Sequence, residues 1–234
     1  MQEKLKTGID TLDAILDGGI PKSHSVLLSG SCGTGKTIVS QIFLFEGAKK
    51  GETGMYISLS EPPDKMIKNL EDFKFFDIKL IRNGKIRIVD ITQDSRLKGM
   101  DPTDVRGVIN LIRSMIQEAD AQRVVIDSVT AISRAMGEDQ KVREFIMELG
   151  FQLCYLGCTS IMISEIPPQQ FMYSIYGIEE FIVDGVILLS EFEQKSDLLR
   201  TLQVIKMRGV NHSRSKHLMK ISNEGIELVP MFEQ

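Results

Sequence analysis

Residues 25–43 read SVLLSGSCGTGKTIVSQIF, and most of what the chain does follows from this stretch. An apolar run, Val26-Leu27-Leu28, precedes a glycine-rich segment, and apolar residues at helical spacing follow it. The segment between them, residues 30–37, is a complete G-x-x-x-x-G-K-[ST] phosphate loop in the strand-to-helix context that this motif requires. Glycines let consecutive backbone N–H groups converge on one anion, and the helix N-terminus adds partial positive charge. The sequence therefore predicts a nucleotide site.

Two positions of the loop carry most of the expected chemistry. We expect Lys36 to reach the β- and γ-phosphates and the Thr37 hydroxyl to ligate Mg²⁺. A second apolar strand, residues 123–127, ends in Asp127, which is expected to hold Mg²⁺ through water beside the loop. The pattern thus predicts a nucleotide and Mg²⁺ as cofactors. The loop residues expected to bind the nucleotide are Ser31, Cys32, Gly33, Thr34, Gly35, Lys36, Thr37 and Ile38.

Short apolar runs alternate with amphipathic stretches along the chain, a rhythm typical of a parallel sheet covered by helices. One helix is expected over residues 101–118, capped by Asp101 with Pro102 in its first turn, and another over 138–156, ended by Gly157. We expect one α/β domain, residues 1–234, with a predominantly parallel twisted sheet, helices on both faces and an antiparallel strand pair at the C-terminal edge. The expected strands occupy residues 25–29, 55–60, 86–91, 123–127, 160–164, 185–189, 201–206 and 217–221.

Composition limits the class of protein. Of 234 residues, 42% are hydrophobic and 26% are charged, which is the globular range and excludes wholesale disorder. No apolar run approaches the roughly 18–20 residues of a bilayer span, and the first ten residues do not resemble a secretory signal. Three cysteines make no closed disulfide framework, so a reducing, cytoplasmic setting is expected. The net charge of −4 argues against a surface built wholly for nucleic acid.

Several motifs in chain order resemble the KaiC family of RecA-like ATPases. They are TGIDTLD at 7–13, GGIP at 18–21, the phosphate loop, IDSVT at 126–130, YGIEEF at 176–181 and KMRG at 206–209. The resemblance runs from about residue 5 to 230 and corresponds to one KaiC domain, where the clock protein has two in tandem. It implies a RecA-like P-loop fold and a hexameric ring with ATP at the interfaces between subunits.

The family resemblance also implies residues that act across the subunit interface. The segment matching Lys206-Met207-Arg208-Gly209 reaches the γ-phosphate held by the next subunit, so Lys206 and Arg208 are implied to assist catalysis. Met207 and His212 match positions near the nucleotide. Residues 195–220 contain seven Lys or Arg and one acid, Asp197. The alternative interpretation of this stretch is a solvated basic strand pair.

One departure from the family concerns the carboxylate that activates water. KaiC domains usually carry two adjacent glutamates there, and this chain has Ser60-Glu61. Because strand side chains alternate faces, Glu61 is expected to point away from the usual position of the base unless the backbone shifts. Glu61 remains the predicted catalytic carboxylate, and Glu165 is a weaker candidate for positioning water. Hydrolysis is therefore expected to be slow.

Three functions remain open at this point. The first is a ring-forming, slowly hydrolysing ATPase that couples nucleotide state to assembly or to binding of a protein partner. The second is a DNA-binding recombination accessory ATPase of the RadA-paralogue type, which is disfavoured because residues 144–194 contain eight acids and no Lys or Arg. The third is a non-hydrolysing nucleotide-binding scaffold, for which Ser60 is the main argument.

Overall fold

The computed structural model describes residues 2–59, 61–101, 103–168, 170 and 172–231, without the side chain of Ala135. The strands are β1 Lys4–Leu5, β2 Ile20–Pro21, β3 Ser25–Gly30, β4 Gly54–Ser58, β5 Ile86–Asp90, β6 Arg123–Asp127, β7 Thr159–Glu165, β8 Gly185–Gln194, β9 Asp197–Met207, β10 Lys216–Ser222 and β11 Gly225–Pro230. The helices are α1 Asp10–Ile15, α2 Lys36–Lys49, α3 Pro63–Leu70, α4 Ile78–Arg82, α5 Ser95–Lys98, α6 Val105–Ala119, α7 Val129–Met136, α8 Asp139–Leu156 and α9 Glu179–Ile182, with a 3₁₀ turn at Ile91–Gln93.

A nine-stranded sheet in the order β11-β10-β9-β8-β3-β7-β6-β4-β5 forms the centre of the described structure. Neighbours from β8 to β5 run parallel, whereas β8, β9, β10 and β11 pair antiparallel in succession. The predicted α/β class is thereby confirmed. The predicted C-terminal pair corresponds to β9 and β10, and β11 is a further antiparallel strand that the sequence pattern missed.

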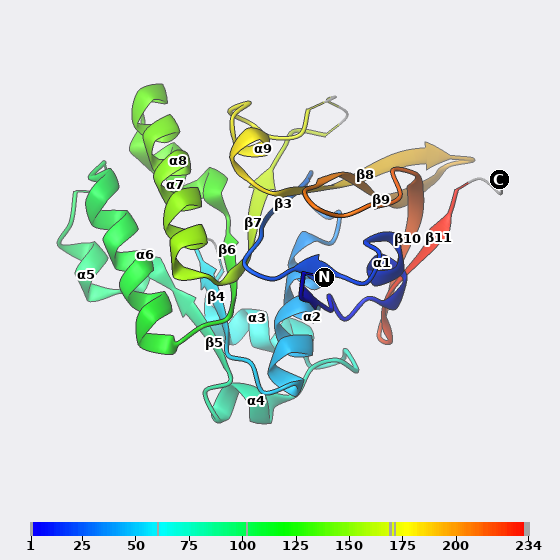
Figure 1. The fold of residues 1–234 in the computed structure, drawn as a ribbon, viewed down its shortest axis with the longest axis horizontal. Coiled ribbons are helices and arrows are strands. Elements are labelled where there is room, and N and C mark those ends of the chain that lie inside the picture. Colours follow the sequence, from blue (N-terminus) through cyan, green and yellow to red (C-terminus); the bar gives the residue numbers. More distant parts are fainter. Residues whose placement is uncertain (1, 60, 102, 169, 171, 232–234) are drawn as a thin grey trace.

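Two apolar layers cover the faces of this sheet. Helices α1 to α4 pack on one face, and α6, α7 and α8 pack on the other (Figure 1). Strands β3 and β4 are buried throughout, as the continuous apolar runs of central parallel strands require. No helix among the described residues is both long enough and apolar enough to cross a bilayer.

One of the two predicted helices has nearly its expected boundaries, whereas the other begins later than expected. Helix α8 ends at Gly157, whose φ of 70° lies in the left-handed region that glycine favours. Helix α6 begins at Val105 rather than near residue 101, and Asp104 caps it by accepting from the Gly107 amide at 3.0 Å. Asp101 instead accepts a hydrogen bond from the Thr103 amide at 2.8 Å, and Pro102 lies outside the described residues. Both aspartates precede the apolar stripe, so the pattern alone did not separate them.

Strand register brings chemically important positions to one edge of the sheet. Gly30 lies opposite Glu165 of β7 and Leu189 of β8, so the loop after β3 leaves the sheet where the parallel strands end. Asp127 ends β6 at the same edge, opposite Ser58 of β4. Open α/β sheets bind ligands at this carboxyl edge.

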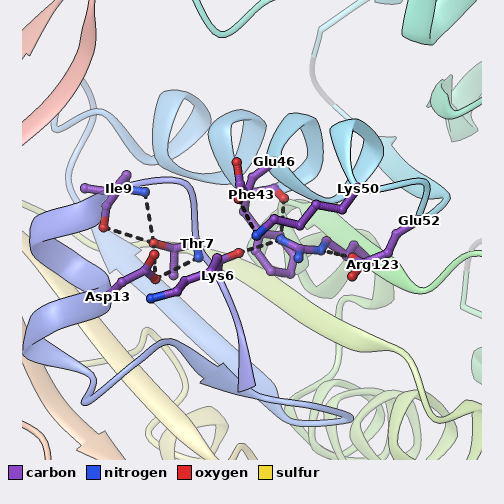
Figure 2. Close-up of polar contacts among 9 residues, drawn as sticks. All are labelled: Lys6, Thr7, Ile9, Asp13, Phe43, Glu46, Lys50, Glu52 and Arg123. Carbon is purple, nitrogen blue, oxygen red and sulfur yellow. Dashed lines mark hydrogen bonds and ion pairs between the residues drawn. The ribbon is translucent and has the colours of Figure 1, made fainter. Parts of the chain in front are cut away.

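A buried guanidinium joins the N-terminal segment to α2 and β6. Arg123 forms an ion pair with Glu52, and its Nη1 donates to the carbonyl oxygens of Lys6 at 2.7 Å and Phe43 at 2.8 Å (Figure 2). The guanidinium carbon also lies 4.6 Å from the centre of the Phe43 ring. A Cβ at residue 47 would lie 2.3 Å from Arg123 Nε, so Gly47 makes room for this contact.

The same region holds a buried carboxylate. Asp13 accepts hydrogen bonds from the Thr7 amide at 2.8 Å and the Thr7 hydroxyl at 2.9 Å (Figure 2). Burial raises the pKa of Asp13, and the two Thr7 bonds oppose that rise. Asp13 and Arg123 thus hold Thr7 and Lys6, two consecutive residues of the N-terminal segment.

Replacing Arg123 by Ala should cost about 3–5 kcal/mol of unfolding free energy, because it leaves Glu52 and two carbonyl groups without their buried partner. The measurement is urea unfolding followed by circular dichroism. Arg87→Ala, at an exposed position on β5, is the matched control and should change the unfolding free energy little. A loss for Arg123→Ala no larger than that of the control would contradict this account.

Candidate functional site

The phosphate loop has the backbone form that an anion site needs. Gly33 and Gly35 have φ values of 81° and 97°, in the region that favours glycine. A Cβ at Gly35 would lie 2.7 Å from Ile221 Cδ1 of β10. The Thr34 hydroxyl donates to the carbonyl oxygen of Ser31 at 2.8 Å and closes the loop. The loop therefore runs directly into the N-terminus of α2, where unpaired amides attract an anion.

The predicted loop residues all lie in this turn or in the first turn of α2. Cys32 and Gly33 are exposed at the tip, whereas Thr34 is buried beneath it. Ile38 packs partly against the apolar core on the α2 side of the sheet. The loop thus has an exposed tip and a buried base.

Lys36 is the buried cation of the site. It opens α2, and its ammonium group donates to the carbonyl oxygens of Gly30 at 2.8 Å and Ser31 at 2.7 Å. Burial lowers the pKa of Lys36, while the nearby charges of Glu165 and Asp127 oppose that shift. A buried ammonium group at the base of an amide-lined loop is suited to a polyphosphate.

Asp127 and its partner Tyr56 form a corner of the site, here called the acidic corner, which faces the first turn of α2. Burial raises the pKa of Asp127, and the Tyr56 hydroxyl, which donates a hydrogen bond to Asp127 Oδ2, opposes the rise. Thr37 and Ser40 of α2 lie near the Tyr56 phenol and act to lower its pKa, so β4, β6 and α2 meet around this oxygen. Burial raises the pKa of Tyr56 well above its ordinary value, and the phenol keeps its proton at neutral pH.

The donor set at this corner fits Mg²⁺ that arrives with phosphates. A hydroxyl and a carboxylate, from Thr37 and Asp127, are the hard oxygen donors that Mg²⁺ prefers. Among the described residues, no group of three or more His, Cys, Asp or Glu side chains is arranged to hold a metal by itself. Such a corner needs phosphate oxygens and water to complete an octahedron, which is how Mg²⁺ is commonly bound at phosphate sites.

The predicted carboxylate Glu61 lies in a turn and not on a strand. Strand β4 ends at Ser58, so the expected strand over residues 55–60 was too long, and Ser60 lies outside the described residues. The Ser58 hydroxyl donates to the Glu61 carbonyl oxygen at 2.8 Å and accepts from its amide at 3.1 Å. The Glu61 carboxylate accepts from Asn69 at 3.1 Å and lies 3.4 Å from the Lys65 ammonium group. The expected alternation of strand faces therefore does not govern where Glu61 points.

Glu165 lies at the same edge of the sheet as the phosphate loop. It ends β7 opposite Gly30, and its amide donates to the Thr130 hydroxyl at 3.0 Å. Its side chain is exposed, and its charge acts on both Lys36 and Asp127. Glu165 is thus a second carboxylate beside the loop.

The KMRG segment lies at the opposite end of the parallel strands, where they begin; we call this the amino edge of the sheet. Val26 at the start of β3 pairs with Gly185 of β8, which pairs with Met207 of β9. Gly30 lies four positions after Val26 on β3, a span of about 13 Å at the usual rise per residue. Lys206 and Arg208 therefore lie together, but they lie apart from the phosphate loop of their own chain.

Local contacts hold these two cations at that edge. The Lys206 ammonium group donates to the carbonyl oxygens of Glu180 at 2.8 Å and Val183 at 2.6 Å, and burial together with the Arg208 charge lowers its pKa. Arg208 forms a 3.2 Å ion pair with Asp184, and its side chain is 55% exposed. Arg208 is thus accessible to a group outside the chain.

The remaining predicted contacts differ in kind. The Met207 side chain is buried in the core, so only its backbone is available to a ligand. His212 lies beyond β9, with its Nδ1 3.2 Å from the Ser213 carbonyl oxygen.

Sequence reasoning missed Arg200, whose Nε donates to the Gly33 carbonyl oxygen at 2.9 Å, because it appeared only as one charge in a basic stretch. Tyr56 was missed for a similar reason, since it appears as one more large residue in an apolar run.

Comparison with known proteins agrees with this geometry. A family model described as "ATPase: KaiC" matches residues 5–233. A UPF0273 protein of Thermotoga maritima is 37% identical over an alignment of 238 positions, which covers 98% of this chain and 97% of the relative. The circadian clock oscillator protein KaiC of Synechococcus elongatus is 33% identical over 232 residues, which cover 97% of this chain and 44% of that protein.

A solved structure gives the same result. The crystal structure of a KaiC-like protein from the hyperthermophilic archaeon Pyrococcus horikoshii has a TM-score of 0.86 and 33% sequence identity. The match covers 98% of this chain and 100% of that chain. The phosphate loop, the sheet order and the full-length family match lead to one conclusion: this chain belongs to the KaiC-like ATPase family, with the UPF0273 proteins, within the RecA-like P-loop superfamily.

Proposed function

We propose that this protein binds ATP with Mg²⁺ between neighbouring copies of a hexameric ring, hydrolyses it slowly, and couples nucleotide state to assembly or to binding of a protein partner. One observation carries the proposal. The phosphate loop leaves the carboxyl edge of the sheet, whereas the exposed Arg208 and the adjacent Lys206 lie at the amino edge. One copy would supply the phosphate loop and its neighbour would supply Lys206 and Arg208. In a closed ring, every phosphate loop would then face the two cations of a neighbouring copy.

Within one site, the two copies would supply different chemistry. Loop amides and Lys36 hold the phosphates, and Thr37 and Asp127 hold Mg²⁺, which neutralises phosphate charge when bound. Arg208 and Lys206 of the neighbouring copy add positive charge at the γ-phosphate, where charge redistributes during hydrolysis. Met207 and His212 of that copy complete the nucleotide contacts, through the Met207 backbone and the His212 ring.

Lys36→Ala tests the nucleotide site itself. Losing a charged hydrogen-bond donor to phosphate should weaken ATP binding roughly ten- to hundredfold. Isothermal titration calorimetry with ATP and with AMP measures the effect, and AMP should be affected less because it lacks the β- and γ-phosphates. Lys79→Ala, at an exposed position on α4, is the control. Wild-type ATP affinity in Lys36→Ala would contradict the nucleotide site.

Lys206→Ala and Arg208→Ala test the contribution of a neighbouring copy. We expect both variants to lose the increase in mass that an ATP analogue causes in the wild type, because the bound phosphates no longer attract the next copy. Light scattering after size exclusion measures the mass with and without nucleotide. Lys195→Asn is the control, since Asn tolerates the left-handed φ of 50° at that turn. Unchanged assembly in both variants would rule out this role.

Glu61→Gln tests hydrolysis. If Glu61 leaves Asn69 to activate water, its loss should lower phosphate release by roughly a hundredfold, whereas Asn69→Ala should preserve or raise release. Glu165→Gln serves as the comparison and should lower release less. Equal rates in Glu61→Gln and wild type would exclude Glu61 as the base. A wild type without Mg²⁺-dependent release would instead favour the non-hydrolysing scaffold, to which the Glu61–Asn69 hydrogen bond also lends support.

A further inference from the structure

Tyr56 lies at the junction of three elements that build the acidic corner. Its side chain is fully buried in the middle of β4, on the α2 side of the sheet. Residue 56 pairs in register with Val125, and Ser58 pairs with Asp127, so the side chains of Tyr56 and Asp127 project on the same face. The phenol therefore meets the Asp127 carboxylate above a layer of apolar residues.

The polar partners of this phenol are unusual for a core residue. Its hydroxyl donates to Asp127 Oδ2, and the side chains of Thr37 and Ser40 of α2 lie close to the same oxygen. A buried phenol needs at least one partner, which a backbone carbonyl usually supplies. Here the partner is the Asp127 carboxylate, with Thr37 close by, and these are the two residues that fit Mg²⁺. Phenylalanine would fill the same space, so packing alone does not explain the hydroxyl.

We propose that Tyr56 is a positioning residue for Mg²⁺: its hydroxyl fixes Asp127 relative to Thr37, so that both are ready when Mg²⁺ arrives with a nucleotide. This inference rests on the proposed function. The Tyr56 bond engages Oδ2, so Oδ1 would be available to accept a hydrogen bond from water on a bound Mg²⁺. A carboxylate held from outside the coordination shell in this way needs less ordering when the metal binds.

The test is Tyr56→Phe, which removes one oxygen and keeps the ring. Binding of a non-hydrolysable ATP analogue is titrated with Mg²⁺, and separately measured in EDTA. We expect the Mg²⁺ concentration at half-saturation to rise roughly three- to tenfold, the effect of one lost hydrogen bond, with binding in EDTA unchanged. Tyr176→Phe, a half-buried tyrosine on the other face of the sheet, is the control and should match the wild type.

A second variant separates positioning from stability. In an Asp127→Asn background, Tyr56→Phe should add no further Mg²⁺ dependence, because the residue acts through the Asp127 carboxylate. Additive effects of the two substitutions would overturn the proposal, as would equal weakening of binding with and without Mg²⁺. A wild type whose nucleotide binding ignores Mg²⁺ would overturn the metal site and this inference together. A Mg²⁺-dependent wild type with an identical Tyr56→Phe curve would overturn this inference alone.

Discussion

Parallel pairing of β3 with β7 and β8 is the constraint on which the candidate site depends. It places Gly30, Glu165 and Leu189 at one edge, and the same pairing through β6 places Asp127 there. The antiparallel return of β9 then carries Lys206 and Arg208 to the other edge. Both groups of residues are thus positioned by the ends of strands, and their separation follows from strand direction.

Burial determines how the charged groups behave at each edge. Lys36 and Asp127 each lose solvation, which lowers the pKa of the lysine and raises that of the carboxylate, and each partly offsets the effect on the other. Lys36 donates to loop carbonyl groups, which a phosphate oxygen can replace. At the amino edge Arg208 keeps an exposed guanidinium on a fixed backbone. The carboxyl edge is therefore preorganised for an anion, and the amino edge offers accessible positive charge.

The sequence predicted those parts of the site whose chemistry is contiguous. The phosphate loop needs eight neighbouring residues, and Asp127 ends a run that is unmistakably a buried strand. Contacts that depend on register were not predictable: Tyr56 and Asp127 are 71 positions apart, and nothing local says that their side chains share a face. The same holds for Arg123, whose partners Lys6 and Phe43 are 117 and 80 positions away. Strand β4 ends at Ser58, whose hydroxyl bonds to the carbonyl oxygen and the amide of Glu61, two residues before the end of the predicted strand.

The central claim is that two copies share each site, and mixing two defective chains tests it most directly. Lys36→Ala keeps Lys206 and Arg208 but has a defective phosphate loop, whereas Arg208→Ala keeps the loop but lacks the Arg208 guanidinium group. If sites are shared, mixed assemblies contain some pairs with an intact loop facing an intact Arg208, so phosphate release in the mixture should exceed that of both variants measured separately. A mixture that releases phosphate only at the average of the two separate rates would contradict the account.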